Sequence, residues 1–234
     1  MNNGTIYNVL TYHLTDILLL VGMLIVPLIA QIMLSSTYSR YSKVHSSRGL
    51  TAAQVARRIL DLNGLNSVRV ERVSGKLTDH YDPRDEVVRL SDGVFNSTSV
   101  AAIGIAAHEC GHACQYAEAY KPIILKNKLV PVTSICSSLW FWVFIAGCVF
   151  TFLPFLTYVG LAMFCAVILF QFATLPVELN ASHRAMKTLE GDSILEHSEL
   201  RPARKVLTAA AMTYIAGLAS SIMQLLRLLM RTRR

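Results

Sequence analysis

One stretch of 49 residues, from Leu129 to Val177, contains no charged side chain. A helix needs about 20 apolar residues to cross the hydrocarbon core of a bilayer, so this stretch is long enough for two crossings. The sequence LPF at positions 153–155 offers a turn between them. We therefore predict a transmembrane hairpin over residues 129–177, which returns the chain to the face of the membrane from which it started.

Two further stretches are also free of charge, residues 17–34 and residues 206–226. The first is predicted to be a retained transmembrane helix rather than a signal peptide, because residues 1–16 contain no Lys or Arg. The second is predicted to be a fourth transmembrane helix or a re-entrant helix, since the basic tail 227–234 that follows it fits poorly on the outer side. With 53% hydrophobic and 16% charged residues, the composition also indicates a membrane protein with three to four spanning helices.

The distribution of basic residues predicts the orientation. No Lys or Arg precedes the 17–34 helix, whereas 13 lie between it and the hairpin. Because Lys and Arg collect on the cytoplasmic side, residues 1–16 are expected outside and residues 35–128 in the cytoplasm. The formal charge of +7 thus fits a chain whose partner is the lipid bilayer and whose basic residues flank the spanning helices on one side. No nucleic-acid binding is expected, because basic and aromatic residues do not alternate on one soluble stretch.

Residues 35–128 contain signals of both helices and strands. We expect a helix that is capped by Thr51 and ends before Gly64, then two strands at 67–73 and 86–91, and then a helix from Ser99 to about Tyr120. The chain is therefore expected to be mainly α, with a smaller α+β region in the cytoplasm.

The second of these helices contains the sequence His108-Glu109-Cys110-Gly111-His112. Residues i and i+4 lie on one face of a helix, so both imidazoles can bind one Zn²⁺. Glu109 is then the expected general base, which takes a proton from a water activated by the metal. Cys110 points away from the histidine face and is expected to pack in the interior.

A catalytic zinc needs a third protein ligand, and Glu178 is the main candidate. It lies 66 residues after His112, but the predicted hairpin fills the gap and returns the chain to the same face. Weaker candidates are Glu190, Asp192 and His80.

Three blocks in order resemble the YugP-type family of membrane zinc metallopeptidases. They are GKLTDHYDPRDEVVRLSDGVF at 75–95, STSVAAIGIAAHECGHACQ at 97–115, and LPVELNASHRA at 175–185. The family is in turn similar to the membrane gluzincins, which include HtpX and the CAAX-processing proteases. The resemblance implies a zincin-like cytoplasmic region in a bacterial cell membrane protein. It also implies His108, His112 and Glu178 as zinc ligands and Glu109 as the base.

The resemblance assigns further roles. The segment 178–205 carries the third ligand. This chain has Ala181-Ser182 where the HtpX group has Ala-Asp, so Asn180 or Ser182 is expected to orient a histidine in place of that carboxylate. In related enzymes an extended substrate pairs with an edge strand along the cleft. That role is expected here for the strand containing Val87, Val88 and Arg89.

The predicted function is a membrane-embedded zinc endopeptidase that cleaves membrane-associated or unfolded proteins. The alternative is a catalytically silent scaffold or binding protein with the same fold. A metal transporter is disfavoured, because residues 129–177 contain no ionisable side chain that could carry an ion through the membrane.

Overall fold

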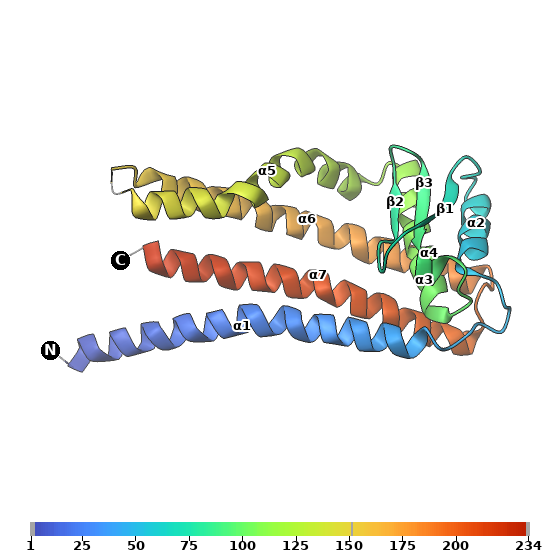
Figure 1. Cartoon of the computed structure of the whole chain (residues 1–234), viewed down its shortest axis with the longest axis horizontal. Helices are drawn as coiled ribbons and strands as arrows, with labels where there is room; N and C mark the ends of the chain where they lie inside the picture. Colours follow the sequence, from blue (N-terminus) through green and yellow to red (C-terminus); the bar gives the residue numbers. More distant parts are fainter. Residues whose placement is uncertain (1–2, 151, 233–234) are drawn as a thin grey trace. The chain divides into compact units, whose positions relative to one another are not determined.

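The structure is a computed structural model that describes residues 3–150 and 152–232. The helices are α1 (Asn3–Tyr41), α2 (Ala52–Leu62), α3 (Asp92–Phe95), α4 (Val100–Ala117), α5 (Lys121–Val149), α6 (Phe155–Gly191) and α7 (His197–Thr232). The strands are β1 (Arg69–Val73), β2 (His80–Asp82) and β3 (Val87–Ser91) (Figure 1). The chain forms two compact units. Unit 1 comprises residues 1–31, 126–173 and 213–234, and unit 2 comprises residues 32–125 and 174–212.

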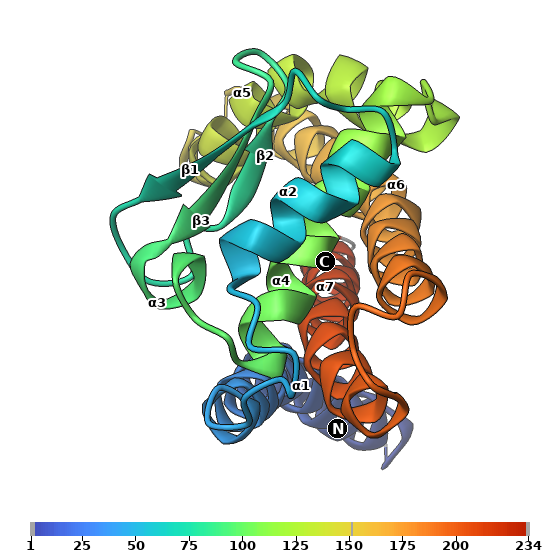
Figure 2. The same ribbon diagram turned by 90° about the vertical axis from the view of Figure 1, so that its right-hand side faces the viewer.

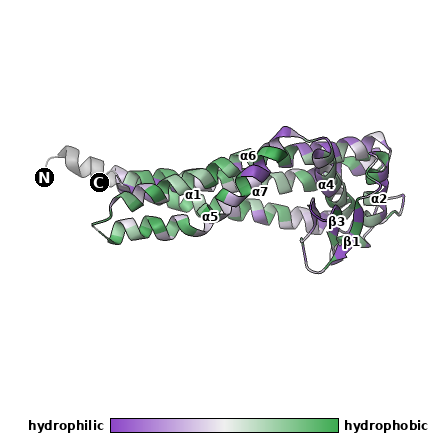
Figure 3. Cartoon of the chain, turned by 90° about the horizontal axis from the view of Figure 1, so that it is seen from above, coloured by the Kyte–Doolittle hydropathy of each residue, from purple (hydrophilic) through white to green (hydrophobic). Residues whose placement is uncertain are grey.

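Four helices, α1, α5, α6 and α7, are long and apolar enough to cross a membrane. Hydrophobic residues cover most of their length (Figure 3). The three charge-free stretches of the sequence lie within these helices, and a turn that includes Leu153 and Pro154 joins α5 to α6. The 206–226 stretch belongs to α7, a continuous helix of 36 residues. The described part of the chain thus contains four candidate spanning helices, as a membrane protein would.

In unit 1, aromatic residues pack α5 against α6. Phe144 and Phe164 are buried together with Leu228 of α7, and the Trp140 and Phe164 ring centroids lie 4.3 Å apart. The helix backbones approach closely at Gly160, where an added Cβ would lie 2.6 Å from the backbone nitrogen of Phe144. A small residue at such a position is the usual means of close helix packing in lipid.

The other two helices of unit 1, α1 and α7, are tied together at their ends. The carboxylate of Asp16 pairs with Arg227 at 2.8 Å and with Arg231 at 3.2 Å. Two of the four C-terminal arginines thus face a carboxylate from α1, so their charge is partly neutralised inside the protein. This pairing lowers the cost that the positive-inside rule predicts for placing them on the outer side.

Unit 2 contains a three-stranded sheet in the order β1-β3-β2. Strand β3 pairs in parallel with β1 and antiparallel with β2 (Figure 2). The prediction that β3 is an edge strand available to substrate is therefore wrong. Its backbone is paired on both sides, Val87 and Val88 are fully buried, and Arg89 forms ion pairs with acidic neighbours. The edge on the α4 side is β2, a strand that the sequence did not predict.

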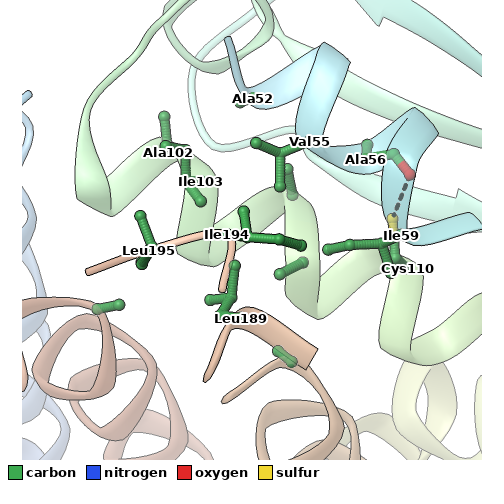
Figure 4. Close-up of a cluster of buried hydrophobic side chains, with 14 of the residues drawn as sticks. Ala52, Val55, Ala56, Ile59, Ala102, Ile103, Cys110, Leu189, Ile194 and Leu195 are labelled. Atoms are coloured by element: carbon green, nitrogen blue, oxygen red, sulfur yellow. Dashed lines mark hydrogen bonds between the residues drawn. The ribbon is translucent and has the colours of Figure 1, made fainter. Parts of the chain in front are cut away.

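The core of unit 2 lies between α2, α4 and the adjoining parts of α6 and α7. Figure 4 shows Val55 and Ile59 of α2 facing Ile103 of α4 and Leu189 of α6, all buried. The predicted cap of α2 is confirmed, because the Thr51 side chain accepts a hydrogen bond from the Gln54 backbone. Cys110 is also confirmed as a packing residue. It is fully buried, its thiol donates to the Ala56 carbonyl (Figure 4), and burial raises its pKa.

Candidate metal centre

Two histidines of α4 form one side of the candidate site. The helix begins after Ser99, whose side chain caps it by accepting a hydrogen bond from the Ala102 backbone. His108 and His112 lie one turn apart, with ring centroids 4.8 Å from each other and planes at 84°. Both rings are only partly exposed, in a helix whose other faces are packed in the core of unit 2.

A carboxylate of α6 completes the group. Glu178 Oε2 lies 3.4 Å from Nε2 of His108 and 3.5 Å from Nε2 of His112, and the Glu178 side chain is buried. Among the described residues, these three form a cluster of potential metal ligands. The weaker candidates Glu190 and Asp192 are not part of it. His80 is not part of it either, since its Nδ1 is hydrogen-bonded to the Thr78 carbonyl at an exposed position of β2.

The spacing of the three ligand atoms fits a zinc ion. Bonds of about 2.0–2.1 Å in tetrahedral geometry place neighbouring ligand atoms about 3.3–3.4 Å apart. The two measured Nε2–Oε2 distances of 3.4 and 3.5 Å are close to that value. Two imidazoles and one carboxylate are also a donor set typical of catalytic zinc, which leaves a fourth position for water or substrate. The residues present therefore fit the metal.

Hydrogen bonds on the far side of each ring turn Nε2 towards this point. Nδ1 of His108 lies 3.1 Å from the Ser182 hydroxyl, and Nδ1 of His112 lies 3.0 Å from Oε1 of Gln115. The Gln115 amide nitrogen donates to the Val177 carbonyl at 2.8 Å and to Asn180 Oδ1 at 3.0 Å. Because both amide protons have acceptors, Oε1 must accept, so Nδ1 of His112 carries the hydrogen and its Nε2 keeps a free lone pair.

Asn180 and Ser182 were predicted from the sequence to orient a histidine, whereas Gln115 was not. Ser182 contacts His108 directly, whereas Asn180 contacts Gln115 and thus lies one step further from the metal ligands. Gln115 is fully buried. The signal for it was a polar residue three positions after His112, on the same helix face, in an otherwise apolar segment.

Close contact between α4 and α6 brings the carboxylate to the histidines. A Cβ added to Gly111 would lie 2.7 Å from the carbonyl oxygen and 3.2 Å from the Cα of Ala181. Only glycine permits this approach without a shift of the backbone. At the end of α4, Arg184 of α6 forms a paired hydrogen bond to Glu118 at 2.6 and 2.7 Å. The two helices are thus held together between the two histidines and again at the end of α4.

Glu109 is buried as well, with 9% of its surface exposed. Burial acts to lower the pKa of His112, but the hydrogen bond to Glu178 and the charge of Glu109 raise it above its usual value. The Glu109 carboxylate is therefore within electrostatic reach of the ligand cluster. Two buried carboxylates beside two imidazoles would be costly without a shared cation, which is a further reason to expect a metal here.

Comparison with known proteins identifies the family. The family model described as "Putative neutral zinc metallopeptidase" matches residues 16–233. A protein of Bacillus subtilis (strain 168), "Putative membrane protease YugP", is 44% identical over 201 residues, which cover 86% of this chain and 89% of that protein. No solved structure matches the chain significantly. The family description implies Zn²⁺ as the cofactor, in agreement with the ligand geometry. By both comparisons, this chain belongs to the family described as putative neutral zinc metallopeptidases.

Proposed function

We propose that the protein is a zinc-dependent endopeptidase of the gluzincin type, which hydrolyses peptide bonds of membrane-associated or unfolded proteins. The observation that carries the proposal is the convergence of two Nε2 atoms and one carboxylate oxygen at 3.4–3.5 Å. In the proposed site, His108, His112 and Glu178 hold the ion. When bound, zinc makes a water molecule acidic enough to lose a proton near neutral pH and polarises the carbonyl that is attacked.

The residues of the chain itself would then act as follows. Glu109 follows His108 in the HExxH segment, and its carboxylate accepts the proton of the attacking water and later delivers it to the leaving amine. Ser182 and Gln115 hold the two rings in the orientation that presents Nε2. Gly111 and Ala181 keep α4 and α6 close enough for Glu178 to share the ion.

The substrate strand is expected to add to β2 rather than to β3. Strand β2 is the sheet edge beside α4, and its Tyr81 ring lies 5.5 Å from the ring of Tyr116, one turn beyond His112. An extended peptide can pair with such an edge through backbone hydrogen bonds.

For the placement in the membrane, we propose residues 1–16 outside and the zincin-like region, residues 35–128, in the cytoplasm of a bacterial cell. The 178–205 segment would lie on the same side. This assignment is supported by the basic residues between the first two charge-free stretches. The charge-free run ends at Val177, directly before Glu178, which favours substrates at the surface of the bilayer.

Two measurements test the proposal. Metal analysis of the purified wild type and of Glu178→Ala should show one zinc per chain in the former and a large loss in the latter. The matched control Glu190→Ala, an exposed carboxylate of the same helix, should keep the metal. Glu109→Gln should retain zinc but lose cleavage of unfolded or membrane proteins, whereas Glu196→Gln keeps both. Cleavage by Glu109→Gln at the wild-type rate would refute the mechanism and favour another base.

A further inference from the structure

A basic groove lies in unit 2 between the C-terminal part of α1 and the N-terminal part of α7. It has a volume of about 870 Å³ and is lined from α1 by Ser36 and Arg40 and from α7 by Arg201, Arg204, Lys205 and Thr208. Ser36 and Arg40 are four residues apart on α1, and the α7 residues follow the i, i+3, i+4, i+7 spacing of one helix face. One face of α1 therefore opposes one face of α7.

The charge of the basic groove is strongly positive. It contains three arginines and one lysine, against a single carboxylate, that of Glu190. In the part of the chain that the structure describes, none of these four basic side chains forms an ion pair. All four side chains are exposed. The groove thus offers several charged donors that the protein itself does not use, and an anion is the ligand chemistry that they fit.

Two of the basic side chains are held in place by one aromatic ring. Arg40 Cζ and Lys205 Nζ lie 5.8 and 5.9 Å from the centroid of the Tyr41 ring. Both distances are within the range of cation–π contacts. The ring therefore restrains an arginine from α1 and a lysine from α7 at the same wall, which reduces the entropy lost when an anion binds.

The position of the groove along both helices distinguishes a lipid from a soluble anion. The charge-free stretch of α1 ends at Leu34, and that of α7 begins at Val206. The groove spans this transition on both helices, with apolar Met33 and Ala209 in its lining beside the basic residues. A pocket with cations at one end and apolar walls at the other matches a headgroup phosphate with its first acyl carbons. A free phosphate would need no apolar wall.

We propose that the basic groove is a binding site for an anionic phospholipid. Arg201, Arg204 and Arg40 contact the headgroup phosphate, the hydroxyl of Thr208 donates to its oxygens, and the acyl chains follow the apolar surfaces of α1 and α7. A cavity of about 870 Å³ is within the range of about 300–1,000 Å³ in which small-molecule ligands bind.

Native mass spectrometry of the full-length protein in a neutral detergent tests the proposal. Phosphatidylglycerol should bind more tightly than phosphatidylcholine. The double substitution Arg201→Gln/Arg204→Gln should weaken phosphatidylglycerol binding by about thirtyfold, since each basic residue near an anionic lipid contributes about fivefold. The control Lys121→Gln/Lys128→Gln removes the same charge from the start of α5, outside the groove, and should bind as the wild type does. Equal loss in both double variants would show a general surface attraction and overturn the proposal.

A second variant guards against a failure of the first to fold. Thr208→Glu keeps every cation but adds a carboxylate to the groove at an exposed helix position, so it should also abolish the preference for phosphatidylglycerol. Bound zinc should be unchanged in both groove variants, because neither touches the metal ligands. Inorganic phosphate at ten millimolar should not displace the lipid. If phosphate displaces the lipid, the groove is a site for free phosphate and the lipid assignment fails. The assignment also fails if Thr208→Glu binds phosphatidylglycerol as tightly as the wild type does.

Discussion

Gln115→Met is the substitution that most directly tests how the proposed metal ligands are oriented. Methionine is close to glutamine in length and is apolar, so the helix and its packing are expected to survive. Three hydrogen bonds are lost, one from His112 and those to Val177 and Asn180. The amide oxygen of Asn180 still receives a hydrogen bond from Arg184, and the Val177 carbonyl lies inside helix α6, so the main group left without a partner is the Nδ1 hydrogen of His112.

The expected losses follow from these lost hydrogen bonds. Loss of a partner that orients a metal-bound histidine weakens metal affinity by about 10–100-fold, or about 1.4–2.7 kcal/mol. Each buried group left without its partner costs about 1–3 kcal/mol of folding free energy. Gln115→Met should therefore bind zinc 10–100-fold more weakly and also be less stable without metal. Gln115→Glu separates the two effects. Its carboxylate still accepts from His112 but cannot donate to the Val177 carbonyl, so stability falls while zinc affinity remains close to that of the wild type.

Competition for zinc with a chromophoric chelator measures the affinity, and thermal unfolding of the metal-free protein measures the stability. Gln171→Met is the matched control, because Gln171 is a glutamine of α6 in unit 1 whose Oε1 has no hydrogen-bond partner among the described residues. It should leave zinc affinity unchanged. Wild-type zinc affinity in Gln115→Met would refute the view that this side chain orients His112.

Three further changes probe the helix contacts. Gly111→Ala places a methyl group against the α6 backbone at Ala181, so we expect a loss of about 1–3 kcal/mol in stability together with weaker zinc binding; a variant that binds zinc normally would contradict the role of this contact. Asp16→Asn removes the partner of two arginines and should lower stability in detergent by about 1.5–3 kcal/mol without loss of zinc. The hydrogen bond from Arg184 lowers the pKa of Glu118, so its contribution is present above the unfolded pKa and is lost as pH falls through the folded one. Glu118→Gln should therefore reduce the acid sensitivity of unfolding, by less than about 1 kcal/mol because the carboxylate is half exposed.

The parts of the fold that depend on local chemistry could be predicted from the sequence. The charge-free runs predicted the long helices, and the hydroxyl of Thr51 predicted the start of α2. The strand β2 was missed because it is three residues long and lies beside a turn at Pro83, too short for an alternating pattern. Because β2 pairs with β3, β3 lies inside the sheet and β2 lies at its edge. Without β2, the sequence led to β3 as the predicted substrate strand.

Helix α6 shows a different limit. The charge-free run ends at Val177, so the prediction separated the hairpin from the 178–205 segment that carries Glu178. Pro176 lies at the same boundary, and proline normally ends or bends a helix because it lacks a backbone donor. The structure instead has one helix from Phe155 to Gly191 with Pro176 inside it. Proline is tolerated in helices of membrane proteins when neighbouring groups satisfy the backbone. Such compensation is a property of the packed protein, so a single sequence does not reveal it.

The continuity of α6 also explains why Glu178, rather than Glu190 or Asp192, faces the histidines. The contact of Gly111 with Ala181 fixes where α6 crosses α4. Glu178 lies three residues before Ala181, about 4.5 Å along the helix, on the same face. Glu190 lies nine residues beyond Ala181, about 13.5 Å along the axis in the opposite direction, and cannot reach the same ion. The ligand assignment thus depends on helix register, so moving the carboxylate by one turn, as in Glu178→Ala/Thr174→Glu, should not restore zinc binding. Restored binding would mean that α6 can slide along α4.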